Sequence, residues 1–176
     1  MLRHLTIAVA VVTALFLVVP TGEAAAQLRF AVAGGPSFPL GDLADGADAG
    51  WHGQVSAGLS VPFIPIALRV DGAYNRFPTP TPGNFQVLSG TVNAVFTIPS
   101  VMITPYFIGG LGFYSSRTTG AGTTAADEAS NAGANIGAGV RLGLPLFSIF
   151  GEARLHNIFH DGDHLRYAPV SIGVHF

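Results

Sequence analysis

Polar and apolar side chains alternate with a period of two along most of the chain that follows residue 26. This alternation is typical of a β-strand whose two faces meet different surroundings, because successive side chains point to opposite sides of the sheet. In the segment 131–144, for example, Ile136, Ala138 and Val140 share one face and glycines lie between them. The pattern predicts eight strands, at residues 28–40, 51–63, 64–76, 86–98, 103–116, 131–144, 147–159 and 165–176.

The links between the predicted strands alternate in length, which indicates how the strands are connected. Three links are short and lie at residues 62–65, 99–101 and 144–146. The other four are longer and polar, at residues 41–50, 77–85, 117–130 and 160–164. Short turns on one side and long loops on the other are typical of an antiparallel up-and-down barrel. In bacterial outer-membrane barrels the short turns lie in the periplasm.

The start of the chain has the pattern of a cleavable secretory signal. A basic start precedes the uncharged apolar run 5–19, and the alanines at 24–26 form a small-residue cleavage pattern. As a helix, this run would rise only about 22 Å, less than the hydrocarbon core of about 30 Å. We therefore expect residues 1–26 to be a signal peptide and residues 27–176 to form one β-barrel domain.

Composition decides which face of the predicted barrel is outside. Only 10% of the residues are charged, whereas the surface of a soluble domain is about 25–35% charged. The polar face consists mostly of Gly, Ser, Ala and Asn, which suit the narrow interior of an eight-stranded barrel. A soluble, lipocalin-like barrel with the opposite facing is the alternative. We expect the apolar face to meet lipid and the polar face to line the lumen.

Charged residues within the predicted strands fall almost entirely on the polar face. An arginine that faced lipid at mid-bilayer would cost about 2–4 kcal/mol, so this distribution agrees with the facing. Buried charges need partners, and we expect a lumen ion-pair network of Arg69, Asp71, Arg141, Glu152 and Arg154. A selective path for small polar solutes is the alternative, which the narrow interior disfavours.

Aromatic residues on the apolar face fall into two levels, which predicts the girdles that flank the lipid band of a membrane barrel. The level near the short turns contains Phe30, Phe63, Phe96, Phe107, Phe147 and Phe176. The level near the long loops contains Phe38, Trp51, Tyr74, Phe113 and Phe159. An unpaired sheet edge is costly in hydrocarbon, so we expect the first and last strands to pair and both termini to lie in the periplasm.

Two segments resemble those of a known family. The alternating end 170–176, with its terminal Phe176, is similar to the carboxy-terminal signature of bacterial outer-membrane barrels, and 105–113 is similar to a glycine-rich strand of the OmpA/OmpX-like group. The resemblance implies an eight-stranded outer-membrane barrel surrounded by outer-membrane lipids and lipopolysaccharide. It also implies that the barrel-assembly machinery reads Phe176. The family has diverse activities, so the resemblance leaves the activity open.

Candidate catalytic and metal-binding residues are few. His156, His160, Asp161, Asp163 and His164 cluster near the last loop, where imidazole and carboxylate could bind a divalent metal; a solvated turn is the interpretation we favour. An outer-membrane lipid A deacylase of similar architecture has a serine two residues after its histidine, where this chain has Ile158. A histidine without its nucleophile cannot carry out acyl transfer.

The sequence therefore predicts a non-enzymatic outer-membrane barrel with a structural or surface-interaction role through its external loops. We expect no cofactor and no nucleic-acid partner, because the net charge is −2 and the arginines are scattered. The sequence indicates no particular extracellular ligand. A narrow channel for small polar solutes and a lipid A-modifying hydrolase remain the alternatives.

Overall fold

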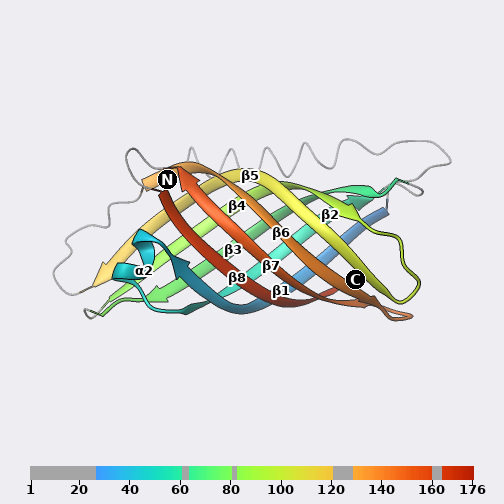
Figure 1. Ribbon diagram of the computed structural model, residues 1–176, viewed down its shortest axis with the longest axis horizontal. Coiled ribbons are helices and arrows are strands. Elements are labelled where there is room, and N and C mark those ends of the chain that lie inside the picture. Colours follow the sequence, from blue (N-terminus) through green and yellow to red (C-terminus); the bar gives the residue numbers. More distant parts are fainter. Residues whose placement is uncertain (1–26, 61–63, 81–82, 121–128, 160–163) are drawn as a thin grey trace.

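The chain folds into a closed barrel of eight antiparallel strands (Figure 1), as the alternation predicts. The computed structural model describes residues 27–60, 64–80, 83–120, 129–159 and 164–176. The strands are β1 (Gln27–Leu40), β2 (Gly50–Ser60), β3 (Ile66–Pro78), β4 (Gly83–Thr97), β5 (Ile103–Gly120), β6 (Ala129–Gly143), β7 (Ser148–Phe159) and β8 (His164–His175). The shortest strand, β2, has 11 residues, which is long enough to cross a bilayer at the tilt of a membrane barrel.

Closure occurs between β1 and β8, also as predicted. The two strands pair on both sides of a short interruption, with Gly34 opposite Ile172 and Ser37 opposite Pro169. At this seam the backbones approach so closely that a Cβ atom on Gly35 would lie 2.1 Å from the carbonyl oxygen of Val170. A residue with a side chain at position 35 would therefore force the seam apart.

The two ends of the barrel differ. The turn end carries the β2–β3, β4–β5 and β6–β7 links together with the start of β1 and the end of β8. The loop end carries the other links, including the short helix α2 (Asp42–Gly46), which lies at the left of the barrel in Figure 1. Leu43 and Ala47 are buried there, and the amide of Asp48 donates a 2.8 Å hydrogen bond to the carbonyl of Pro78.

Two long links expected from the sequence, 77–85 and 117–130, are wrong in extent; in the second, β5 continues to Gly120 and β6 begins at Ala129. Strands β3 and β4 stay paired through Phe77–Phe85 and Pro78–Asn84, so the first link consists of residues 79–82 alone. The rings of Phe77 and Phe85 lie 6.4 Å apart, and Phe77 is fully buried. Packing inside the barrel thus extends these strands through a segment whose Pro and Gly residues suggested a loop.

The apolar face points outward and the polar face lines the interior, as the composition indicated. Leu111, Ile136 and Ile172 are 67%, 67% and 72% exposed. Asn75 and Asn93, which belong to the polar face, are each 1% exposed. In the part of the chain that the structure describes, no helix is long and apolar enough to span a membrane.

Large apolar side chains also fill the interior near the loop end, which the alternation did not predict. We call this the loop-end cluster, and its buried members are Leu43, Ala47, Phe77, Val87, Tyr114, Ile158 and Tyr167. Phe77 and Tyr167 pack edge to face at its centre, with ring centroids 5.7 Å apart. Apolar side chains therefore fill part of the loop-end half of the lumen, beside buried polar residues such as His52, Asn75 and His156.

The expected signal peptide at residues 1–26 and the girdle residue Phe63 lie outside the described residues. Both stay predictions from the sequence.

Candidate functional site

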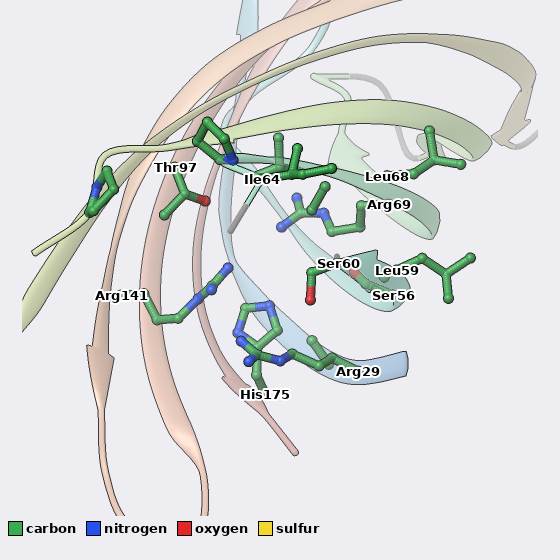
Figure 2. A pocket seen from close by; sticks show the side chains of 16 residues that line it. Arg29, Ser56, Leu59, Ser60, Ile64, Leu68, Arg69, Thr97, Arg141 and His175 are labelled. Atoms are coloured by element: carbon green, nitrogen blue, oxygen red, sulfur yellow. The ribbon is translucent and has the colours of Figure 1, made fainter. Parts of the chain in front are cut away.

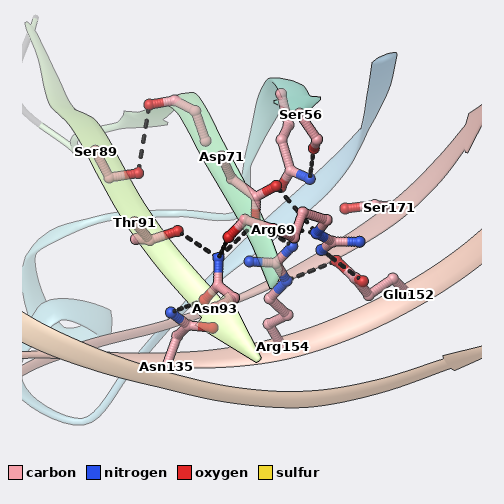
Figure 3. A network of polar contacts seen from close by, with 12 residues as sticks. Ser56, Arg69, Asp71, Ser89, Thr91, Asn93, Asn135, Glu152, Arg154 and Ser171 are labelled. Atoms are coloured by element: carbon pink, nitrogen blue, oxygen red, sulfur yellow. Dashed lines mark hydrogen bonds and ion pairs between the residues drawn. The ribbon is translucent and has the colours of Figure 1, made fainter. Parts of the chain in front are cut away.

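Four charged side chains meet in the middle of the lumen (Figure 3). We call Arg69, Asp71, Glu152 and Arg154 the charge quartet. Arg69 Nη2 donates to both oxygens of Glu152, at 2.9 and 2.8 Å, and Arg154 Nη2 donates to Asp71 Oδ2 at 2.8 Å. Within each strand the remaining pairs are Arg69 Nε with Asp71 Oδ1 at 3.0 Å and Arg154 Nε with Glu152 Oε1 at 2.6 Å. Each charge touches two opposite charges, so the ring is neutral.

Strand topology explains why the four charges complement one another. In a closed order of eight strands β3 and β7 lie on opposite walls, and both odd-numbered strands run in the same direction. Along β3 the cation precedes the anion, whereas along β7 the anion precedes the cation. Each cross-lumen pair therefore joins opposite charges, Arg69 with Glu152 and Asp71 with Arg154.

Neutral hydrogen-bond donors complete the coordination of the two carboxylates. Tyr106 donates its hydroxyl to Glu152 Oε2 at 2.8 Å, and Asn93 Nδ2 donates to Asp71 Oδ2 at 2.8 Å. Asn135 in turn donates to Asn93 Oδ1 at 2.8 Å. The side chains of Asp71 and Glu152 are 2% and 0% exposed, so these donors replace the water that burial removes.

Inward-facing glycines leave room for these large side chains. Gly139 lies between Tyr106 on β5 and Glu152 on β7. A Cβ atom there would lie 2.4 Å from the Tyr106 ring. Similar pairs place Arg154 beside Gly137, Asn93 beside Gly110 and Phe150 beside Gly173. The glycines of the polar face therefore leave the space that the large side chains of the network occupy.

Arg141 does not belong to this network, and in this respect the sequence prediction is wrong. Its guanidinium lies 5.6 Å from the centre of the Tyr106 ring, and among the described residues it forms no ion pair. It lies closer to the turn end, where its side chain enters a cavity together with Arg29 and His175 (Figure 2). Alternation assigned Arg141 to the correct face, but it does not fix the level of a residue along the barrel axis.

His156, the histidine of the hydrolase alternative, is held inside the lumen. Its Nδ1 lies 3.0 Å from the hydroxyl of Tyr114, and its ring stacks on Tyr167 at 4.8 Å. Only 5% of the residue is exposed. Among the described residues, no serine is hydrogen-bonded to His156. The loop-end cluster lies against the histidine ring.

The proposed metal ligands are not brought together by the described part of the structure. His156 points into the lumen, and His164 begins β8. His160, Asp161 and Asp163 lie outside the described residues. Within the described ranges, no group of three or more His, Cys, Asp or Glu residues could hold a metal ion.

A second histidine–hydroxyl pair was missed by the sequence analysis. His52 Nε2 on β2 lies 2.8 Å from Ser171 Oγ on β8, on either side of β1. Gly35, which is opposite His52 in the β1–β2 ladder, has no side chain to separate them. Both residues are 3% exposed and neither lines the cavity at the turn end, so the pair links β2 and β8 across β1 at the barrel seam.

Apart from Phe63, the aromatic residues expected to form girdles are described by the structure and lie on the outer face. At the loop end the rings of Trp51 and Tyr74 are 5.7 Å apart. At the turn end Phe96 is opposite Phe107. The exposed members are Phe30, Phe38, Trp51, Phe96, Phe107, Phe113, Phe147, Phe159 and Phe176, and Tyr74 is half-buried. Their contact with the boundaries of a membrane stays a prediction.

Several solved structures share this barrel. Neisserial surface protein A matches with a TM-score of 0.67 and 17% identity, over 85% of this chain and 97% of the other. Ail, the attachment invasion locus protein of Yersinia pestis, matches with a TM-score of 0.58 and 17% identity, over 88% and 100%. A major outer membrane protein from Thermus thermophilus gives 0.58 and 14%, over 85% and 99%.

These neighbours are eight-stranded outer-membrane barrels, as the resemblance of the two sequence segments implied. Their low sequence identity limits the similarity to the fold. No protein-family model matches this sequence, and neither does any curated protein.

Proposed function

We propose that this protein is an integral outer-membrane barrel whose lumen is sealed and whose role is structural or depends on surface contacts through its loop end. The outward apolar face supports the membrane location, because Val55, Leu111 and Ile172 would otherwise be exposed to water. The shared fold with outer-membrane barrels also supports it. In this orientation the turn end and both ends of the barrel domain face the periplasm.

The charge quartet is the main observation that supports a sealed lumen. It joins opposite walls through ion pairs of 2.8 Å, and its four side chains are at most 5% exposed. The loop-end cluster fills the interior beyond it. An ion would have to displace both layers, so the geometry favours a plug over a channel.

A surface role is supported by what two of the neighbours are named. One is a Neisserial surface protein and the other is an attachment invasion locus protein. The hydrolase alternative is disfavoured because His156 contacts Tyr114 and Tyr167 inside the lumen. Outer-membrane lipids and lipopolysaccharide would surround the barrel.

Phe176 is the expected signal for the barrel-assembly machinery, and its position supports that role. Its amide and carbonyl both bond to Phe30, at 2.9 and 3.0 Å. Its side chain is nevertheless 64% exposed on the outer face. The residue thus completes the seam while leaving its ring accessible for recognition.

Membrane fractionation tests the location. We expect the protein in the outer-membrane fraction, extracted only by detergent, with faster gel mobility before boiling than after it, because the closed barrel resists SDS until heated. Gel mobility and fractionation are measured on the same preparation. A folded monomer that stays dispersed in detergent-free buffer would contradict the proposal.

Planar-bilayer recording tests the sealed lumen. We expect no discrete conductance steps, because the charge quartet and the loop-end cluster occupy the lumen. Insertion is verified on the same material from its heat-modifiable gel mobility. Regular steps whose size changes in the variant Arg69→Gln would instead identify a channel through the quartet.

A further inference from the structure

The lumen contains a cavity between the charge quartet and the turn end (Figure 2). Its volume is about 600 Å³. Arg69 of the quartet belongs to its lining, and residues of the turns, Pro65 and Pro99, lie at its other limit. In the proposed membrane orientation, a ligand would reach this cavity from the turn end, which faces the periplasm.

The charges that line this cavity have one sign. Three arginines, Arg29, Arg69 and Arg141, line it beside the imidazole ring of His175, and the described part of the lining contains neither Asp nor Glu. Arg69 is neutralised by Asp71 and Glu152, whereas Arg141 forms no ion pair with any described residue. Arg141 therefore brings into the cavity a positive charge that no ion pair with a described residue neutralises.

Two buried nitrogen atoms in the lining have no hydrogen-bond partner among the residues that the structure describes. They are Arg141 Nε and His175 Nδ1. His175 is only 8% exposed, and its ring is held against Phe150 with centroids 4.4 Å apart. A buried polar atom left without a partner costs free energy, and a guanidinium costs more than a neutral group. An anion with several acceptor oxygens would satisfy both requirements.

We propose that this cavity is a binding site for an oxyanion of the phosphate class, with Arg141 as its main ligand and His175 beside it. The planar guanidinium matches two phosphate oxygens at once. Hydroxyl groups of Ser56, Ser60 and Thr97 line the same space and are able to donate to the remaining oxygens. The phosphate comes either from a free periplasmic anion or from a phospholipid headgroup at the turn end.

Calorimetric titration of the barrel in a sugar-based detergent, which contains no phosphate, tests the site with inorganic phosphate as the probe. We expect saturable binding of one phosphate per barrel. Arg141→Gln should weaken it at least tenfold, because a charge-assisted pair is lost. His175→Phe should also weaken it, since it keeps the ring beside Phe150 and removes both nitrogens.

The matched control is Arg76→Gln, which removes an arginine from the exposed loop end of β3 and should leave phosphate binding unchanged. A second arm adds phosphatidylglycerol to the micelles and measures retained lipid by native mass spectrometry. Lipid retained by the wild type and lost in Arg141→Gln identifies the headgroup as the source, whereas phosphate binding without lipid retention identifies the free anion.

Binding of neither probe would overturn the proposal. Binding that Arg141→Gln leaves at full strength, with the variant folded by gel mobility, would overturn it equally.

Discussion

Replacing Glu152 with glutamine is expected to lower the free energy of unfolding by about 3–5 kcal/mol, the usual cost of removing one partner from a buried ion pair. Glu152 accepts hydrogen bonds from Arg69, Arg154 and Tyr106. The variant leaves one uncompensated positive charge in the middle of the lumen. Urea titration of the barrel folded into lipid vesicles, followed by the fluorescence of the single tryptophan, Trp51, measures the change.

Two controls separate the lumen effect from a change in net charge. Asp42→Asn alters the net charge equally, but Asp42 is exposed on α2, and we expect a change within about 0.5 kcal/mol. The double variant Arg69→Gln with Glu152→Gln restores neutrality and leaves the Arg154–Asp71 pair. Its cost should be smaller than the sum of the two single variants. Equal stability of Glu152→Gln and Asp42→Asn would contradict the quartet as the centre of the lumen.

The fold follows from the sequence because one physical constraint acts on every strand. A closed sheet with lipid outside and a narrow interior requires strict alternation, and a shift of one residue would exchange the two faces. Each predicted strand accordingly overlaps an observed one, and the closure of β1 on β8 was expected. The prediction of a loop at 77–85 was wrong because Pro and Gly indicate only a local preference for turns. Phe77 and Phe85 pack inside the barrel and keep the two strands paired.

The site was predicted less completely because alternation gives the face on which a residue lies and not its position along the barrel axis. It placed Arg141 with the quartet, although Arg141 lies toward the turn end. A usable signal was present: Arg69-x-Asp71 and Glu152-x-Arg154 have opposite charge order. Strands four apart in an up-and-down barrel run in the same direction, so opposite order gives complementary pairs at one level.

The loop-end cluster was missed for a related reason. Val87, Tyr114 and Tyr167 occupy the polar face although they carry large rings or apolar groups. Alternation alone assigns most apolar side chains to lipid. A sealed lumen, however, also needs large side chains inside the barrel. Glycines paired with them on neighbouring strands show where these side chains fit. Sequence periodicity therefore predicts the strands of this barrel and their two faces better than it predicts the side-chain packing in the lumen.

Replacing Ile136 with arginine is the test that acts on the outer face, and we expect it to destabilise the barrel in lipid vesicles by about 2–4 kcal/mol. Ile136 lies at the middle of β6 and is 67% exposed. In a bilayer that position faces the hydrocarbon centre, where a guanidinium loses its hydration. The urea midpoint in vesicles and the yield in the outer membrane measure the effect.

Ile136→Ala is the matched control, because it removes the same side chain without adding a charge. Ile136 stands opposite Gly109 and Leu155 in the two ladders, and the alanine variant leaves the ion pairs of the lumen untouched. We expect it to remain much closer to the wild type than the arginine variant does. Arginine and alanine variants of equal stability in vesicles would mean that this face meets water, and the membrane orientation on which the proposed function rests would then be wrong.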